Sequence, residues 1–400
     1  MTEQEWKPVP IGLDAPGYVS RVGSKKVLVA VHSLVAGQRL LDVVDLIESD
    51  PRVQLVYSQA PAVFSGGVGD YLKSLGAMRI PWAQATRERF DLALAAAHAD
   101  NDRIHAPLMV FPHGASFGKR AGGSAGPVYG LDAGRLTRDG RVLPSSLVLS
   151  HDSQLELLER QCPPALDVAL VAGDPCFDRM LASTRKRAEY RAALGVGPER
   201  RLVLVTSTWG PHSLFSRFER YLPTLLRQLD PARYRVAMMM HPGVWFGHGL
   251  RQVRSWLGSA RTGGMLLVEP DEDWRGFAIA ADYVIGDQGS TTVYAAALGK
   301  PVLCTDLPIE SLNPDSPQTL LGTAPRLVRS QPIEPQLLAA AQWRATVARD
   351  AFARLVTSRP GQSHRLLRQE MYRLLGITAR GRHRAVEPVP VPVAGERRWR

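Results

Sequence analysis

The sequence is poor in cysteine and has no long apolar run, and both absences narrow the class of protein. Its 400 residues include three cysteines, Cys162, Cys176 and Cys304, with no spacing typical of a metal site. We expect reduced thiols of the cytoplasmic kind rather than disulfides. No stretch of about 18 apolar residues occurs, so the sequence predicts no transmembrane helix.

The motifs of several common enzyme classes are missing as well. The sequence contains no P-loop, no metal-ligand cluster and no Gly-x-Ser-x-Gly nucleophile turn. Residues 1–23 lack a basic start followed by an apolar core, so we expect no secretory signal. No stripe of basic residues interleaved with aromatics occurs, which argues against nucleic acid as a partner. We therefore expect a cytoplasmic protein that needs no cofactor and no metal.

Positive charge is in excess, with a net charge of +11. This excess suggests anionic partners, and nucleotide phosphates, a polyphosphate-like polymer or anionic lipid headgroups fit it equally well. Peripheral contact with the inner face of an anionic membrane is thus an open alternative. A generally basic composition with no specific partner is the competing explanation.

Buried apolar runs alternate with helical segments along the chain, which predicts a parallel α/β protein. The length suits two domains. The predicted strands form two series, separated by a charged helical region at 182–201. They are Lys25–Val31, Val53–Tyr57, Pro107–Phe111, Ser146–Ser150 and Val168–Gly173 in the first series, and Leu202–Thr206, Val236–Met240, Met265–Val268, Tyr283–Ile285 and Val302–Cys304 in the second.

We divide the chain accordingly into five parts. Residues 1–23 form an extension, 24–185 a Rossmann-like acceptor-side domain, and 186–360 a Rossmann-like nucleotide-donor domain. A closing helix at 361–378 precedes a basic tail at 379–400, which we expect to be disordered or extended because it is rich in Arg and Pro.

The most informative segment runs from Ala281 to Leu303. It is typical of a strand, a tight polar loop, a short helix, a Gly stop and a second strand. The loop brings Gly289, Ser290, Thr291 and Thr292 to a helix N-terminus, where free N–H groups and the helix dipole favour a phosphate. Helix capping by Ser290 alone would explain the pattern equally well.

Two histidines follow predicted strands and are candidates for chemistry. His113-Gly114 ends one strand, and a neutral imidazole there can take a proton from an attacking hydroxyl. His241-Pro242 ends another, and this histidine can donate to a phosphate oxygen. For each one, a histidine that only hydrogen-bonds a loop or packs at a strand end is the alternative explanation.

Further polar turns also follow strands. Thr206 to Gly210, with Thr208 at its centre, lets an anionic group approach closely. Asp287 would repel a phosphate, so we expect it to brace its loop or to meet a ligand hydroxyl. The Gly-rich turn Ser65–Tyr71 could shape the acceptor side of a ligand cleft. Gly173-Asp174-Pro175 is typical of a structural turn at a strand end, and Asp271–Asp273 of a solvated loop.

Taken in order, these motifs resemble the CDP-glycerol glycerophosphotransferase family, of the wall teichoic acid polymerase type. The resemblance spans roughly 27–375 and rests on five motifs: His113-Gly114, Gly173-Asp174-Pro175, Ser207-Thr208-Trp209, His241-Pro242 and Ala281–Pro301. It implies an α/β protein of the GT-B fold, with two facing Rossmann-like domains, an inter-domain cleft and the donor nucleotide held mainly by the second domain.

The resemblance also implies a role for each matching residue. His113 corresponds to the catalytic base on the acceptor side and His241 to the histidine at the donor diphosphate. Ser290 and Thr291 correspond to the hydroxyl pair at the diphosphate helix, and Asp287 to the aspartate before them. The chain differs from the family where basic residues are usual, since Met238-Met239-Met240 precede His241 and Gly210 follows Trp209.

The expected function is a metal-independent transferase of cell-envelope polymer or glycan synthesis. Its donor would be a nucleotide diphosphate, CDP-glycerol-like or a nucleotide sugar. Its acceptor would be a hydroxyl of a polyol-phosphate, a glycan or a small molecule. Two alternatives stay open: an enzyme like UDP-N-acetylglucosamine 2-epimerase, and a catalytically silent GT-B protein that binds a nucleotide or a partner.

Overall fold

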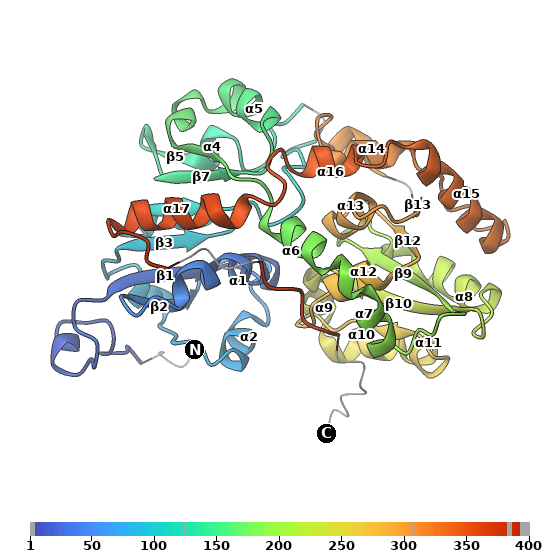
Figure 1. Cartoon of the computed structure of the whole chain (residues 1–400), viewed down its shortest axis with the longest axis horizontal. Helices are drawn as coiled ribbons and strands as arrows, with labels where there is room; N and C mark the ends of the chain where they lie inside the picture. The colour runs from blue at the N-terminus through green and yellow to red at the C-terminus, as the bar shows by residue number, and fades with distance from the viewer. Residues whose placement is uncertain (1–4, 124, 306, 382–385, 393–400) are drawn as a thin grey trace. The chain divides into compact units, whose positions relative to one another are not determined.

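The computed structural model describes residues 5–123, 125–305, 307–381 and 386–392. The chain divides into two compact units (Figure 1). The first unit consists of residues 1–117, 126–176 and 357–385, and the second of residues 118–125, 177–356 and 386–400. The chain therefore passes between the units several times. The sequence analysis had separated the two Rossmann-like domains at 185/186 and set the helix at 361–378 apart from both. Short segments far apart in the sequence complete each unit.

The first unit is built on a six-stranded parallel sheet in the order β2-β1-β3-β4-β7-β8. Apolar runs such as Val27–Val31 are fully buried, as expected for strands covered on both faces. The strands are β1 (Lys25–Val31), β2 (Val53–Gln59), β3 (Leu92–Ala95), β4 (Leu108–Val110), β7 (Ser146–Leu149) and β8 (Ala169–Val171), with β5 (Thr137–Arg138) and β6 (Arg141–Val142) as a small antiparallel ribbon.

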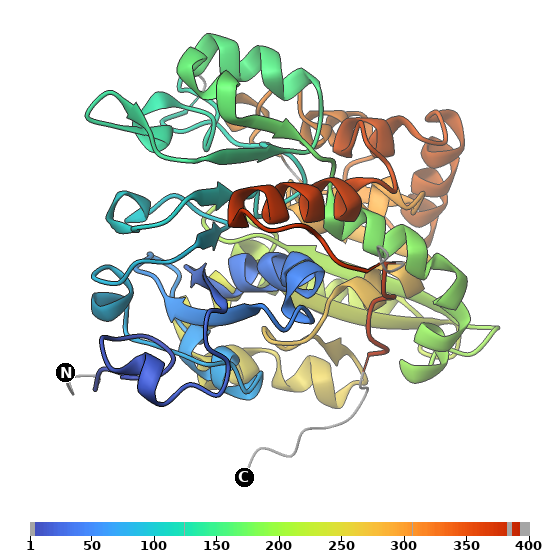
Figure 2. The same ribbon diagram turned by 60° about the vertical axis from the view of Figure 1, so that its left-hand side comes forward.

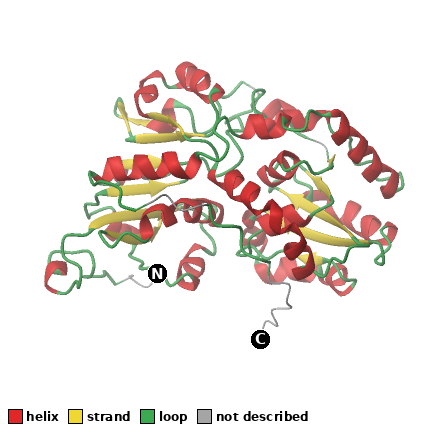
Figure 3. Ribbon diagram, viewed as in Figure 1, coloured by secondary structure: helices red, strands yellow, loops and turns green. Residues whose placement is uncertain are grey.

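Helices connect and cover these strands (Figure 3). Ser33 caps α1 by accepting a hydrogen bond from the amide of Ala36. The C-terminal helix α17 packs against α1, and the two lie side by side in Figures 1 and 2. The helices of this unit are α1 (Leu34–Glu48), α2 (Val68–Ser74), α3 (Trp82–Ala85), α4 (Ala133–Leu136), α5 (Ser153–Gln161) and α17 (Ser363–Leu375), with α6 (Pro175–Ser183) crossing into the second unit.

The second unit has a five-stranded parallel sheet in the order β11-β10-β9-β12-β13. Its core is separate from that of the first unit and includes Val203, Met238, Trp245 and Ile285. The strands are β9 (Arg201–Ser207), β10 (Tyr234–Met240), β11 (Leu266–Leu267), β12 (Tyr283–Gly286) and β13 (Val302–Cys304).

Ten further helices of the described residues follow in the second unit. They are α7 (Arg187–Ala193), α8 (Phe218–Gln228), α9 (Pro242–His248), α10 (Leu250–Trp256), α11 (Gly258–Thr262), α12 (Arg275–Ala280), α13 (Ser290–Ala297), α14 (Pro317–Leu320), α15 (Ile333–Thr346) and α16 (Ala351–Val356). Short 3-10 turns lie at 15–17, 101–103, 163–168, 184–186, 215–217, 309–311 and 321–323. None of the described helices is long and apolar enough to cross a bilayer.

Part of the expected disordered tail is packed against the second unit. The amide of Val389 donates to the Ser183 hydroxyl at 2.8 Å, and its carbonyl accepts from the Tyr190 hydroxyl at 2.7 Å. Val389 itself is buried. These hydrogen bonds fix 386–392 as an extended segment, which is one of the two states expected for the tail, and rule out disorder there. Residues 382–385 and 393–400 lie outside the described residues.

Candidate functional site

The strand order of the second unit creates a topological switch point at its central strand. Strand β9 has β10 on one side and β12 on the other, and ligands of open parallel sheets bind at the carboxyl ends beside such a point. Thr208 follows β9, His241 follows β10 and Asp287 follows β12. Three of the residues expected from the sequence thus lie at one edge of one sheet.

Asp287 is the structural centre of this edge. Its side chain is fully buried, and one carboxylate oxygen accepts from the Thr208 amide at 2.8 Å, the Thr208 hydroxyl at 2.9 Å and the Leu214 amide at 3.0 Å. The other oxygen accepts from the Gly289 amide at 3.1 Å. Burial raises the pKa of Asp287, and these hydrogen bonds oppose the rise. Asp287 joins the loops after β9 and β12, which is the bracing role considered from the sequence.

The N-terminus of α13 presents hydroxyls to this edge. Gly289 is the N-cap residue, and Ser290 and Thr291 are the first two residues of the helix. No side chain caps the helix, and within the described residues neither hydroxyl has a hydrogen-bond partner. Ser290 therefore does not act as the N-cap, and the orphan N–H groups of the first turn stand beside two hydroxyl donors.

Thr292 lies on the opposite side of the same helix turn. It is fully buried, and its hydroxyl bonds the Thr206 hydroxyl at 2.8 Å. Gly286 lets this pair come close, because a Cβ at that position would collide with both threonine side chains. The Thr292 hydroxyl therefore stabilises the packing of α13 on the sheet, and only its backbone amide belongs to the helix N-terminus.

His241 has a defined ring orientation. It is the N-cap residue of α9, and its Nδ1 accepts from the Gly243 amide at 2.9 Å. In the neutral imidazole the proton therefore resides on Nε2, which is a donor. The Trp209 ring lies beside it, with centroids 6.4 Å apart.

Lys119 supplies a cation at this edge that was not predicted from the sequence. Lys119 belongs to the second unit, and its Nζ lies 5.3 Å from the centroid of the Trp209 ring. The three methionines before His241 are buried in β10, so they present no polar group to the edge. The signal available in the sequence was the basic pair Lys119-Arg120, six residues beyond His113.

His113 lies in the first unit, just past β4. The residue is exposed, and its ring meets the edge of Tyr129 at 6.5 Å between centroids. The same tyrosine also packs against His98 at 6.1 Å and carries the guanidinium of Arg135 at 4.1 Å from its ring centroid. Tyr129 thus gathers two imidazoles and one cation at the carboxyl edge of the first sheet.

His98 is a second candidate that the sequence did not reveal. It follows β3, and burial together with the charges of His113 and Arg135 lowers the pKa of His98 to about 4, against the opposing charge of Asp132. His32, after the neighbouring strand β1, is buried, and its pKa is also lowered by burial. These two imidazoles are neutral near pH 7, as a proton acceptor must be.

The remaining sequence candidates have structural surroundings. Gly67 is the left-handed N-cap of α2 in the Gly-rich turn, at φ +75°. Asp174 is buried and pairs with Arg39 at 2.9 Å. In the acidic loop, Asp273 pairs with Arg275 at 2.6 Å.

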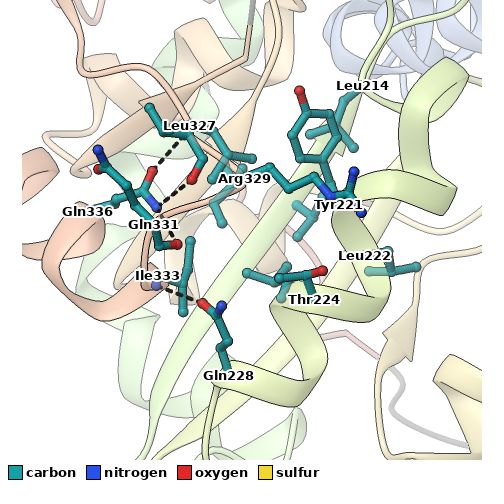
Figure 4. Close-up of a pocket in the computed structure, with 14 residues that line it drawn as sticks. Leu214, Tyr221, Leu222, Thr224, Gln228, Leu327, Arg329, Gln331, Ile333 and Gln336 are labelled. Carbon is teal, nitrogen blue, oxygen red and sulfur yellow. Dashed lines mark hydrogen bonds between the residues drawn. The ribbon is translucent and has the colours of Figure 1, made fainter.

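The second unit also has an apolar pocket (Figure 4). It is lined by the α8 side chains Leu222 and Leu225 and by the segment 327–336. Gln336 fastens that segment by donating to the carbonyls of Val328, Gln331 and Pro332. Its lining residues supply only Tyr221 and Arg329 as titratable groups, so this pocket offers little chemistry.

No group of three or more His, Cys, Asp or Glu side chains in the described parts of the chain is arranged to hold a metal ion. No family model matches the sequence, and no curated protein matches it either.

Solved structures, in contrast, are similar to the chain. The wall teichoic acid polymerase TagF is 12% identical with a TM-score of 0.61, and 88% of this chain covers 90% of that one. S. aureus MnaA in its co-structure with UDP is 15% identical with a TM-score of 0.53, covering 88% and 98%. UDP-GlcNAc 2-epimerase from Neisseria meningitidis, bound to UDP-GlcNAc, is 14% identical with a TM-score of 0.50, covering 88% and 99%.

These likenesses establish the fold. The chain has the α/β fold of the GT-B type, with two Rossmann-like units, as the sequence predicted.

Proposed function

We propose that this protein is a transferase that uses a nucleotide-diphosphate donor to modify a hydroxyl acceptor. The observation that carries the proposal is the N-terminus of α13, where Ser290 and Thr291 present hydroxyls without partners among the described residues, at the same edge of the sheet as His241. A helix N-terminus with extra donors favours an anion such as a diphosphate. The solved structures similar to the chain include one bound to UDP and one bound to UDP-GlcNAc.

In the proposed reaction the acceptor hydroxyl loses its proton to His113 as its oxygen attacks the donor. With a CDP-glycerol-like donor, the new bond forms to the distal phosphorus, and the bond between that phosphorus and the bridging oxygen breaks, releasing the nucleoside monophosphate. With a nucleotide sugar, the new bond forms to the anomeric carbon and the nucleoside diphosphate leaves. His241 Nε2–H, Ser290, Thr291 and the α13 dipole would stabilise the charge on the leaving phosphate.

The structural frame of the site supports a donor-binding role for the second unit. Thr208, Gly289 and the backbone amide of Thr292 border the same strand ends, and Asp287 fixes the loops that hold them. We assign acceptor binding to the first unit, with a polyol-phosphate, a glycan or a small molecule as the acceptor. A role in cell-envelope polymer or glycan synthesis, at the cytoplasmic side of the membrane, agrees with these chemistries.

An epimerase acting on a nucleotide sugar is the second candidate. It is favoured by the likeness to the UDP-GlcNAc 2-epimerase from Neisseria meningitidis, which shares the GT-B fold of the chain. An epimerase converts its nucleotide sugar without any acceptor. The two candidates therefore differ in whether product formation requires an added hydroxyl compound.

A thermal-shift panel with CDP-glycerol, CDP-ribitol, UDP-sugars and GDP-sugars tests the proposal. A ligand at 100 times its Kd stabilises the native state by about 2.7 kcal/mol, so the correct donor stands out by its shift in Tm. The best donor is then incubated with and without candidate acceptors. Failure of every donor to raise Tm argues against the proposed function, and binding without any turnover favours the catalytically silent alternative.

A further inference from the structure

The proposed donor site would gain from positive charge, which the residues directly before His241 and directly after Trp209 do not supply. A nucleoside diphosphate carries two to three negative charges, and hydrogen bonds from cations are about twice as strong as neutral ones. The positions before His241 and after Trp209 hold Met240 and Gly210. Met240 is buried in β10, so no cation reaches the edge from there.

Lys119 reaches this edge from an unexpected part of the chain. It lies between two stretches of the first unit, yet the segment 118–125 belongs to the second. The Arg120 amide donates to the Ser311 carbonyl and the Asn313 amide donates to the Gly118 carbonyl, both at 3.0 Å. The backbone of Lys119 also forms an isolated antiparallel β-bridge with that of Leu312. Backbone hydrogen bonds therefore fix the position of Lys119 within the second unit.

Gly118 lets the segment lie close to α14. A Cβ at this position would collide with the side-chain amide of Gln318, which is itself buried. A larger residue directly before Lys119 would therefore force the Gln318 side chain to move.

The surroundings of the ammonium group are suited to an anion. Lys119 Nζ lies over the face of Trp209, a ring that is 42% exposed and adjacent to His241. Reduced hydration lowers the pKa of Lys119, and the negative charge of Asp287 opposes this effect. Among the described residues no carboxylate forms an ion pair with Lys119. Asp287 itself is occupied by the donors of its own loops.

We infer that Lys119 is a diphosphate-binding residue of the donor site, where the residues directly before His241 and directly after Trp209 carry no charge. This inference rests on the proposed function. Lys119 donates to a phosphate oxygen from the Trp209 side, while Ser290 and Thr291 donate from the α13 side. Because only the phosphates meet this charge, Lys119 determines the preference for nucleoside diphosphates over nucleosides.

The experiment compares the full-length protein with its Lys119→Met variant in isothermal titration with UDP, CDP, uridine and cytidine. We expect Lys119→Met to weaken binding of the preferred diphosphate about 10- to 50-fold and to leave the nucleosides within about twofold. Lys119→Arg, which keeps the charge, should retain most of the affinity. The salt dependence of diphosphate binding should also be smaller in Lys119→Met, because fewer ionic contacts are screened.

Lys186→Met is the matched control, since Lys186 is another lysine of the second unit and pairs with Glu189 at 3.3 Å. It should bind the diphosphate like the native protein. Unchanged diphosphate affinity in Lys119→Met overturns the inference and leaves the proposed function standing. If neither diphosphate binds the native protein, the proposed function fails, and the inference fails with it.

Discussion

The two sheets share one architecture but carry different chemistry at their carboxyl edges. In the first unit, imidazoles follow three neighbouring strands, with His32 after β1, His98 after β3 and His113 after β4. In the second unit, the corresponding edge holds threonine and serine hydroxyls, a helix N-terminus and the buried Asp287. Imidazoles, which can accept protons, gather on one sheet, and groups that bind anions gather on the other.

This difference suggests that the first edge serves catalysis and the second edge donor binding, which each variant below can test. Changes at the first edge should alter turnover and its pH dependence. Changes at the second edge should alter donor affinity and the stability of its loops. A variant that moves the wrong quantity would contradict the division.

The largest effect is expected from His113→Ala. Removing a general base typically costs a factor of 10²–10⁴ in rate, while the donor site of the second unit keeps all its groups. Steady-state kinetics should therefore show turnover reduced about 10²- to 10⁴-fold, with donor Kd unchanged within about twofold. His151→Ala is the control, because His151 follows the next strand but its Nδ1 is held by Ser153. A parallel loss of donor affinity in His113→Ala would sink the base assignment.

The Asp287→Ala variant tests the brace of the second edge. The change leaves the Thr208, Leu214 and Gly289 amides without their buried acceptor, and each such group costs about 1–3 kcal/mol. Urea unfolding should therefore show a loss of about 3 kcal/mol or more, together with loss of donor binding. Asp152→Ala, which breaks the half-exposed pair with Arg359, should cost about 1 kcal/mol or less. Equal losses in the two variants would contradict the bracing role.

How far the sequence predicts this fold depends on the composition of each strand. Strand β1 was expected at Lys25–Val31 and is observed there, because its valines favour a buried strand. Strand β3 was missed, since Leu92–Ala95 is made only of leucine and alanine, which favour helices. Because β3 was not predicted, His98, three residues beyond its end, was not recognised as a candidate either.

The site was predicted where its residues directly follow recognisable strands. His241, Asp287 and Ser290 were found in this way, and their roles as ligands or catalysts stay predictions. Lys119 was missed because its neighbour Trp209 lies far along the chain, and tertiary contacts alone bring them together. The sequence likewise did not show that the Thr292 hydroxyl is buried while Ser290 and Thr291 are not, because this depends on the packing of Thr292 against Thr206.

A smaller effect is expected from Ser290→Ala and Thr291→Val. Because neither hydroxyl caps the helix or has a partner among the described residues, the unfolding free energy should change by less than about 0.5 kcal/mol. Donor affinity should fall about 5- to 10-fold in each variant, the value of one or two lost hydrogen bonds. Thr292→Val should show the reverse, since it leaves the Thr206 hydroxyl unpaired and costs about 1–2 kcal/mol. Donor affinity that is insensitive to both Ser290 and Thr291 would remove α13 from the donor site.

The smallest effect is expected in the pH dependence of stability at the first edge. The pKa of His98 is about 4 in the folded protein, below the ordinary value of 6.5. Between these pH values the unfolded chain binds a proton that the native state does not, so the unfolding free energy falls as the pH drops from about 6.5 to 4. Allowing for partial exposure, we expect His98→Gln to remove on the order of 1–2 kcal/mol of this fall. Urea unfolding at several pH values measures the slope. An equal pH dependence of the unfolding free energy in the native protein and in His98→Gln would mean that protonation of His98 costs no stability. The imidazoles of the first edge would then not be held neutral, which would contradict the contrast with the second edge.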